Sequence, residues 1–206
     1  MTLYSRWILP YLTDLSMRQK RLVPFRQRVV RQAHGRVLEI GIGSGLNLPF
    51  YDRGIEWVCG IDPSPELLGF AQKRIREAAV PIELVRASSE ALPLEDQSID
   101  TIVVTFTLCT IPDVAQALTE MRRAVKPDGE LLFVEHGRAP EPRVARWQDR
   151  LTPLWRRVVG GCHLNRDVDE LIRTAGFRLE QVRTGYLGAW TPRSMAFFYE
   201  GRARPV

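Results

Sequence analysis

The stretch RVLEIGIGSGLN (residues 36–47) decides the fold. A short apolar run over residues 36–40 leads into three glycines at alternate positions, Gly41, Gly43 and Gly45. Glycine allows a sharp turn and lets a ligand come close to the main chain. A strand followed by such a loop and by a short helical segment (46–52) predicts an α/β domain whose ligand lies at the carboxyl end of the strand.

Strand-like and helix-like segments alternate along the rest of the chain. We expect strands at 57–62, 82–87, 99–106, 130–136, 177–185 and 194–203, helices at 64–78, 113–125, 143–158 and 166–175, and a turn at 126–129. This alternation predicts a doubly wound, mostly parallel sheet. Residues 35–206 are expected to form this domain. Residues 1–34 read as helices interrupted at Pro24, and we expect them to form a lid across it.

Composition narrows the class of protein. The chain has 206 residues and three cysteines, enough for one domain with a sizeable core. It contains no apolar run of about 18 residues, as a membrane span would need. An odd number of cysteines without metal-ligand spacing favours a reduced, cytoplasmic protein with no metal.

The net charge of +5 owes much to one early stretch, residues 18–31, which carries six Lys and Arg side chains. These side chains form either a solvated helix face or a weak contact with an anionic membrane surface. No aromatic–basic signature for RNA accompanies them, so we expect no nucleic-acid partner.

The glycine loop discriminates among cofactors. A dinucleotide motif needs glycine where this chain has Leu46, and no Lys-Ser/Thr pair follows for a triphosphate. Glu39 stands two residues before the first glycine and would repel a diphosphate but accept from a cation. Asp62 ends the second strand, where a carboxylate can bind both hydroxyls of a ribose. The pattern predicts an adenosine-like, positively charged ligand such as S-adenosylmethionine (SAM).

Four segments then resemble the successive motifs of Rossmann-like SAM-dependent methyltransferases, a group that includes the ubiquinone and menaquinone biosynthesis enzymes. They are VLEIGIGSG (37–45), GIDPSPELL (60–68), ASSEALPLEDQSID (87–100) and LTEMRRAVKPDGELLFVEH (118–136). The resemblance implies a seven-stranded sheet whose last strand is antiparallel, and methyl transfer that leaves S-adenosylhomocysteine. It implies these cofactor-binding residues: Glu39, Gly41, Gly43, Ser44, Gly45, Asp62, Pro63, Ser88, Ser89, Glu90, Thr105 and Phe106.

Three further segments, TLCTIPD (107–113), VEHGRAP (134–140) and WQDRLTPLWRRVVGGCHLNRD (147–167), resemble the microsomal thiol S-methyltransferases. This narrower resemblance implies a small thiol acceptor. Two other functions stay open: methylation of carbon, oxygen or nitrogen on a quinone, lipid or other metabolite, and binding of SAM, its product or RNA without catalysis.

A thiol acceptor must lose its proton, and an imidazole can take it or stabilise the thiolate. His136 and His163 are therefore the candidate catalytic residues, with a loop-anchoring role as the alternative for His136 and a surface position as the alternative for His163. We expect Cys109, Cys162, Trp7 and Tyr11 to line the acceptor pocket, with plain packing as the alternative for each. Trp147, Trp155 and Trp190 are further candidates for this wall.

Overall fold

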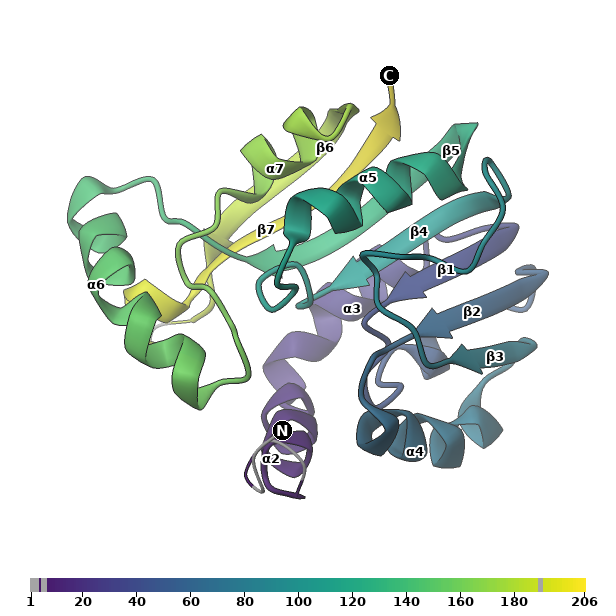
Figure 1. Cartoon of the computed structure of the whole chain (residues 1–206), viewed down its shortest axis with the longest axis horizontal. Coiled ribbons are helices and arrows are strands. Elements are labelled where there is room, and N and C mark those ends of the chain that lie inside the picture. The colour runs from purple at the N-terminus through teal and green to yellow at the C-terminus, as the bar shows by residue number, and fades with distance from the viewer. Residues whose placement is uncertain (1–3, 5–6, 189–190) are drawn as a thin grey trace.

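The structure is a computed structural model that describes residue 4 and residues 7–188 and 191–206. One seven-stranded sheet runs in the order β3-β2-β1-β4-β5-β7-β6 (Figure 1). Its strands are β1 (Arg36–Ile40), β2 (Trp57–Ile61), β3 (Ile82–Val85), β4 (Ile99–Thr105), β5 (Val125–His136), β6 (Phe177–Tyr186) and β7 (Phe197–Pro205). Strand β7 is antiparallel to both β5 and β6, and the other neighbours are parallel. The predicted sheet is confirmed.

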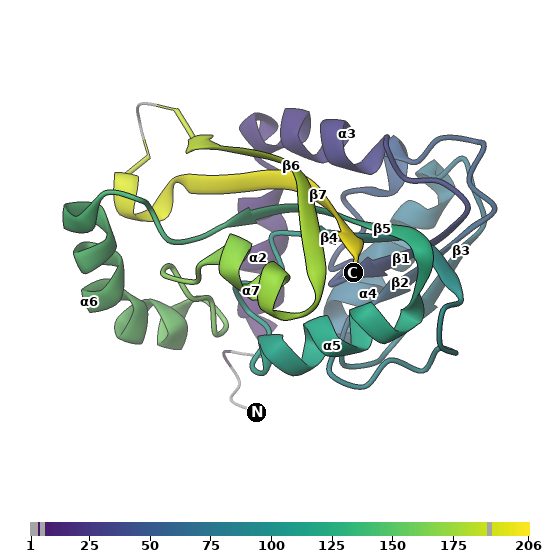
Figure 2. The same ribbon diagram turned by 90° about the horizontal axis from the view of Figure 1, so that it is seen from above.

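Helices cover both faces of the sheet. They are α2 (Leu9–Met17), α3 (Val23–Val30), α4 (Pro65–Arg74), α5 (Val114–Ala124), α6 (Pro142–Val158) and α7 (Val168–Thr174). Short 3₁₀ turns occur at η1 (Lys20–Leu22), η2 (Leu48–Phe50), η3 (Ile75–Glu77) and η4 (Arg193–Met195). One hydrophobic cluster lies between the sheet and helices α5 and α7, and another lies between the sheet and helices α3 and α4. Figure 2 shows α3 on one side of the sheet and α5 and α7 on the other.

Polar side chains cap the starts of helices α4, α5 and α7. Ser64 accepts from the Leu67 N–H at the start of α4, and Asp113 and Asp167 cap α5 and α7 in the same way. These caps keep the connecting loops at the carboxyl edge of the sheet. Helices α2 and α6 lie beyond this edge, where the arrowheads of the central parallel strands point (Figure 1).

Three local expectations were wrong. Residues 126–129 belong to β5, because Ile99 pairs with Val125 while Thr101 pairs with Glu130, so the extra residues bulge within the strand. Pro24 lies in the first turn of α3, where a missing N–H costs nothing, and the interruption comes earlier, after Met17. The helix expected at 46–52 is only the 3₁₀ turn Leu48–Phe50.

Within the described part of the chain, no helix combines the length and the apolarity needed to cross a membrane.

Candidate active site

A cavity of about 950 Å³ lies at the carboxyl edge of the sheet. The glycine-loop end is lined by Gly41, Asp62 and Ser88, and the other end by Cys109, His136 and Cys162. Helix α2 forms a wall between them with Leu9, Pro10, Leu12, Thr13, Ser16 and Met17. A smaller recess of about 140 Å³ shares Gly41, Asp62 and Phe106 with this cavity. One continuous space therefore joins the two sets of predicted residues.

The glycine loop turns with positive φ at all three glycines. At Gly41 a Cβ would lie 2.2 Å from Cγ2 of Thr107, so no side chain fits there. At Gly43 a Cβ would meet only the Gly41 carbonyl oxygen, at 3.8 Å, because the residue faces open space in the recess. Gly43 is the point of this loop where a ligand can lie directly against the main chain.

Asp62 is held at the rim of this space by two backbone donors. The Gly43 N–H donates to Oδ2 at 3.0 Å and the Ser64 N–H donates to Oδ1 at 2.8 Å. Burial raises the pKa of Asp62, and the two hydrogen bonds oppose that rise. The fixed carboxylate keeps free lone pairs toward the cavity, which suits it to accept from a pair of ribose hydroxyls.

Glu39 lies behind the lining rather than on it. Its oxygens accept from Nδ2 of Asn47 and from the hydroxyl of Tyr51, both at 2.8 Å. Burial raises the pKa of Glu39 to about 7, in spite of these two bonds. The carboxylate thus orients Asn47 and Tyr51 and places negative charge beneath the glycine loop.

Arg26 completes this network, although the basic stretch that contains it reads as an exposed helix face. Its guanidinium is buried and donates to Oδ1 of Asn47 at 2.9 Å and to Oγ1 of Thr105 at 3.1 Å. It also lies over the ring of Phe106, 5.0 Å from the centroid. Burial lowers the pKa of Arg26 to about 10. Phe106 itself has φ of 56°, a strained value for a side-chain-bearing residue.

Helix α2 is tied to the glycine loop through Asp14. This buried carboxylate pairs with Arg74 of α4 at 2.9 Å and with Arg18 at 2.5 Å. Arg74 also donates to the carbonyl oxygen of Ser44. We call this set, Asp14 with Arg74 and Ser44, the α2 latch, because it joins the wall of the cavity to the loop that the ligand faces.

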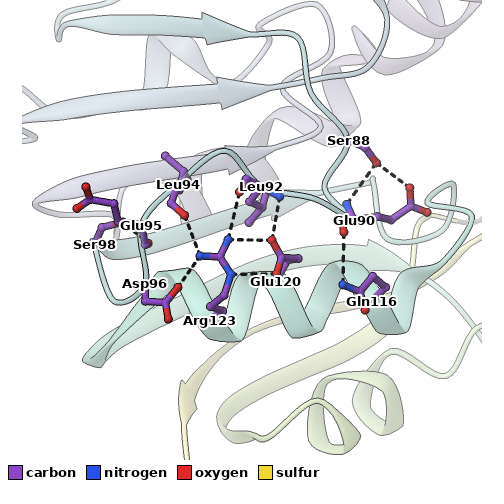
Figure 3. Close-up of polar contacts among 10 residues, drawn as sticks. All are labelled: Ser88, Glu90, Leu92, Leu94, Glu95, Asp96, Ser98, Gln116, Glu120 and Arg123. Carbon is purple, nitrogen blue, oxygen red and sulfur yellow. Dashed lines mark hydrogen bonds and ion pairs between the residues drawn. The ribbon is translucent and has the colours of Figure 1, made fainter.

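The loop after β3 carries Ser88, Ser89 and Glu90 to the cavity, and α5 fixes that loop (Figure 3). Ser88 Oγ donates to the Glu90 carboxylate at 2.7 Å, and Gln116 of α5 donates to the Glu90 carbonyl oxygen at 3.5 Å. Arg123 of α5 donates to the carbonyl oxygens of Leu92 and Leu94 at 3.1 and 2.8 Å, and pairs with Glu120 and Asp96.

At the far end of the cavity the fold gathers Cys109, His136 and Cys162, the thiol–imidazole cluster. Their ligand atoms lie within 4.8 Å of one another, and His136 Nε2 is 3.0 Å from Cys162 Sγ. A hydrogen bond between the two thiols raises the pKa of Cys109 and lowers that of Cys162. Burial works against the charged form of His136, yet its hydrogen bond to Cys162 raises the pKa of His136.

Three separate segments supply the cluster, and polar contacts hold them together. Arg166 donates to the carbonyl oxygens of Leu108 and Ile111, the latter at 2.7 Å. Glu135, whose pKa burial raises to about 7, accepts from the N–H groups of Thr107 and Leu108 at 2.5 and 2.9 Å. The His163 N–H donates to the Cys109 carbonyl oxygen at 2.8 Å. These bonds fix the loops that carry the two thiols.

The structure places most predicted site residues on the cavity or recess. These are Gly41, Gly43, Ser44, Asp62, Pro63, Ser88, Ser89, Glu90, Thr105, Phe106, Cys109, His136 and Cys162. Glu39 and Gly45 lie behind them, and the His163 ring is not on the lining.

The predicted aromatic wall is mostly elsewhere. Trp7 and Tyr11 are 60% and 59% exposed and do not line the cavity, and the Tyr11 ring packs edge-on against Phe70 of α4 instead, with 5.1 Å between the ring centroids. Trp147 is 57% exposed as well, Trp155 does line the cavity, and Trp190 lies outside the described residues.

Several residues of the site escaped the sequence analysis. Arg26, Asn47 and Tyr51 read as ordinary surface or packing positions. The sequence does contain a signal for Asn47 and Tyr51. Both are polar residues in the segment that follows the glycine loop, and a carboxylate such as Glu39 beside that loop needs hydrogen-bond donors.

Comparisons with known proteins agree with this geometry. Residues 38–133 match the family described as "Methyltransferase domain". Human thiol S-methyltransferase TMT1B is 32% identical over 184 residues, which cover 84% of this chain and 75% of that protein. Across the TMT1B proteins of rat, mouse and human, this chain spans 61% to 75% of the relative's length.

A phosphatidylethanolamine N-methyltransferase from Cereibacter sphaeroides is 34% identical over 137 residues, 65% of this chain and 66% of that protein. A solved SAM-dependent methyltransferase from Aquifex aeolicus shares the fold, with a TM-score of 0.67 at 19% identity over 96% of this chain and 98% of that one. The chain with the Asp62 rim and the open glycine loop therefore belongs to the Rossmann-like SAM-dependent methyltransferases, with SAM as methyl donor and S-adenosylhomocysteine as product.

Proposed function

We propose that the protein S-methylates a small, apolar thiol. The observation that carries the proposal is the thiol–imidazole cluster, at the opposite end of the same cavity from Asp62. Apolar side chains such as Leu9, Leu12 and Val159 make up much of the wall between the two ends. The likeness to human thiol S-methyltransferase TMT1B supports the same acceptor class.

SAM, when bound, supplies a methyl group on a positively charged sulfur that is already activated for in-line displacement. The chain's residues then have to bind and orient. Asp62 accepts from the ribose hydroxyls, and Gly43 lets the ligand lie against the main chain. Glu39, Asn47 and Arg26 keep the floor of the recess rigid. Alignment of acceptor and methyl in such a site is worth about 7–11 kcal/mol in favourable cases.

The acceptor's proton is the second task. A free thiol has a pKa near 8.5 and is only a few per cent thiolate at neutral pH. The polar groups nearest the acceptor end are Cys109, His136 and Cys162, and we assign them the removal of this proton. His163 acts through its main chain, as the donor that holds the Cys109 loop.

The test is a panel of thiols, phenols, amines and quinols incubated with SAM, with S-adenosylhomocysteine as the readout. We expect turnover with apolar thiols. The variant Asp62→Asn should lose cofactor binding, and His136→Gln should keep cofactor binding by calorimetry while thiol turnover falls. Turnover confined to non-thiol acceptors would contradict the proposal and leave the methyltransferase assignment intact.

A second candidate is N-methylation of a lipid amine, supported by the likeness to the Cereibacter sphaeroides enzyme. A neutral amine can attack without prior loss of a proton, so His136→Gln should spare amine turnover. Phosphatidylethanolamine vesicles belong in the same panel for this reason.

A further inference from the structure

We propose that Cys109, His136 and Cys162 form a zinc site with three protein ligands, and that its fourth position faces the cavity and takes the acceptor thiol. Only the binding of the acceptor thiol at the fourth position rests on the proposed S-methylation. The metal site itself stands on the geometry of the thiol–imidazole cluster. The prediction of no metal rested on the spacing of ligands along the sequence. Cys109, His136 and Cys162 are far apart in the sequence and come together only in the fold.

The donor set is one that zinc prefers. Two thiols and an imidazole with one open position are typical of catalytic zinc, whereas structural sites have four protein ligands. With Zn–S near 2.3 Å and Zn–N near 2.0–2.1 Å, ligand atoms of a tetrahedral site lie about 3.5–3.8 Å apart. Here the three ligand atoms lie within 4.8 Å of one another, with Nε2 and Sγ of His136 and Cys162 at 3.0 Å. Small side-chain adjustments therefore reach zinc geometry.

The surroundings also suit an ion. All three ligands line the cavity, so an ion has an access path and a free coordination position. Arg166 donates to the carbonyl oxygens of Leu108 and Ile111, and these hydrogen bonds hold the Cys109 turn. Such supporting contacts orient metal ligands and tune their basicity. Two thiolates balance the charge of one Zn²⁺, so that burial of the site carries no net charge out of water.

The acceptor thiol binds zinc at the open position and releases its S–H proton to solvent water, so the cluster promotes loss of this proton through the metal and not through His136 as a base. A lone pair of the zinc-bound thiolate then forms the new S–CH₃ bond. The bond between that carbon and the cofactor's sulfonium breaks, and its electron pair stays on the cofactor's sulfur. A negative thiolate and a positive sulfonium become two neutral thioethers, which an apolar cavity favours. The product thioether, a weaker neutral ligand, then leaves the zinc.

The first experiment uses the full chain and the metal alone. The reduced protein, freed of metal with a chelator, is titrated with Zn²⁺ and with Co²⁺, and bound metal is measured by elemental analysis. We expect one ion per chain and, with cobalt, thiolate-to-metal absorption together with the visible bands of a tetrahedral site. Cys109→Ser and Cys162→Ser should each abolish stoichiometric binding, because each removes one of the three protein ligands. Cys59→Ala, which removes the thiol buried in β2, is the matched control and should change nothing.

The second experiment adds an apolar thiol to the cobalt protein without SAM. A shift of the cobalt spectrum supports direct ligation, and an unchanged spectrum overturns the acceptor half of the inference. Failure to bind stoichiometric metal, or a Cys109–Cys162 disulfide in place of a metal-binding pair, overturns the site itself. Thiol turnover that survives a chelator would leave the proposed function standing without zinc. Tight metal binding without thiol methylation would support the zinc site and contradict the proposed S-methylation.

Discussion

Glu39 couples the binding of a cation to pH. Burial raises its pKa from 4.5 to about 7, so the folded chain holds this proton more tightly than the unfolded chain does. The resulting stabilisation is complete below about pH 4.5 and is lost as the pH rises through about 7. A positive charge in the recess favours the ionised carboxylate and therefore opposes the proton.

We expect SAM to bind more tightly as the pH rises from about 6 to about 8, with release of a proton. Calorimetry in two buffers of different ionisation enthalpy measures both quantities. Glu39→Gln should bind more weakly at the higher pH and lose most of the pH dependence. Glu130→Gln is the control, because Glu130 is buried in the middle of β5 and does not line the cavity. An affinity that does not change between pH 6 and 8 would rule this coupling out.

At the scale of single elements, α5 acts as the support of the loop after β3. Arg123 is the main contact, with two carbonyl acceptors in the loop and two carboxylate partners (Figure 3). Its neighbour Arg122 points elsewhere, to the carbonyl oxygens of Gly176 and Val206. The two adjacent arginines therefore offer a matched pair of variants.

Arg123→Ala should lower the free energy of unfolding by roughly 1–2 kcal/mol, since two carbonyl oxygens and two partly exposed ion pairs lose their partner. Amide hydrogen exchange over residues 88–96 should quicken, and SAM affinity should fall. Arg122→Ala should leave exchange in that loop unchanged. Equal effects of the two substitutions on residues 88–96 would show that the loop does not depend on Arg123.

Helix α2 is two-sided. One side lines the cavity, and the other exposes Tyr11 and Leu15, at 59% and 68%, close to the basic residues Arg18 and Lys20. An apolar strip beside positive charge is typical of a helix that lies on an anionic bilayer.

We expect weak co-sedimentation with vesicles of anionic lipid at low salt, and loss of binding as salt screens the charges. Leu15→Glu should abolish it by placing a negative charge in the apolar strip. Val206→Glu is the control, because Val206 is exposed at the far end of the chain, in the last position. Binding that ignores both salt and Leu15 would argue against this surface.

At the scale of the whole molecule, the sequence predicts the sheet well and the site in part. The strands are short apolar runs punctuated by glycine, proline and polar caps, and these signals are local. The bulge at 126–129 depends on how Val125 and Glu130 pair with β4, so a turn-like KPDG motif misleads. The glycine loop and Asp62 follow a spacing that local sequence records.

The acceptor end could not be predicted in this way. Cys109, His136 and Cys162 come from a turn, a strand end and a loop behind α6, and their proximity exists only after these segments fold together. Arg26 misleads for the same reason, because its neighbours suggest solvent while α3 turns it onto Asn47 and Thr105.

The α2 latch has a kinetic consequence. Because Asp14 pairs with Arg74, and Arg74 holds the Ser44 carbonyl of the glycine loop, we expect α2 to slow the departure of a nucleoside from that loop. SAM should therefore bind before the acceptor, and S-adenosylhomocysteine should be released last, so that its release limits the rate of turnover. Asp14→Asn should raise the off-rate of S-adenosylhomocysteine in stopped-flow measurements and relieve inhibition by accumulated product. An unchanged off-rate would show that the α2 latch does not control the order of binding and release.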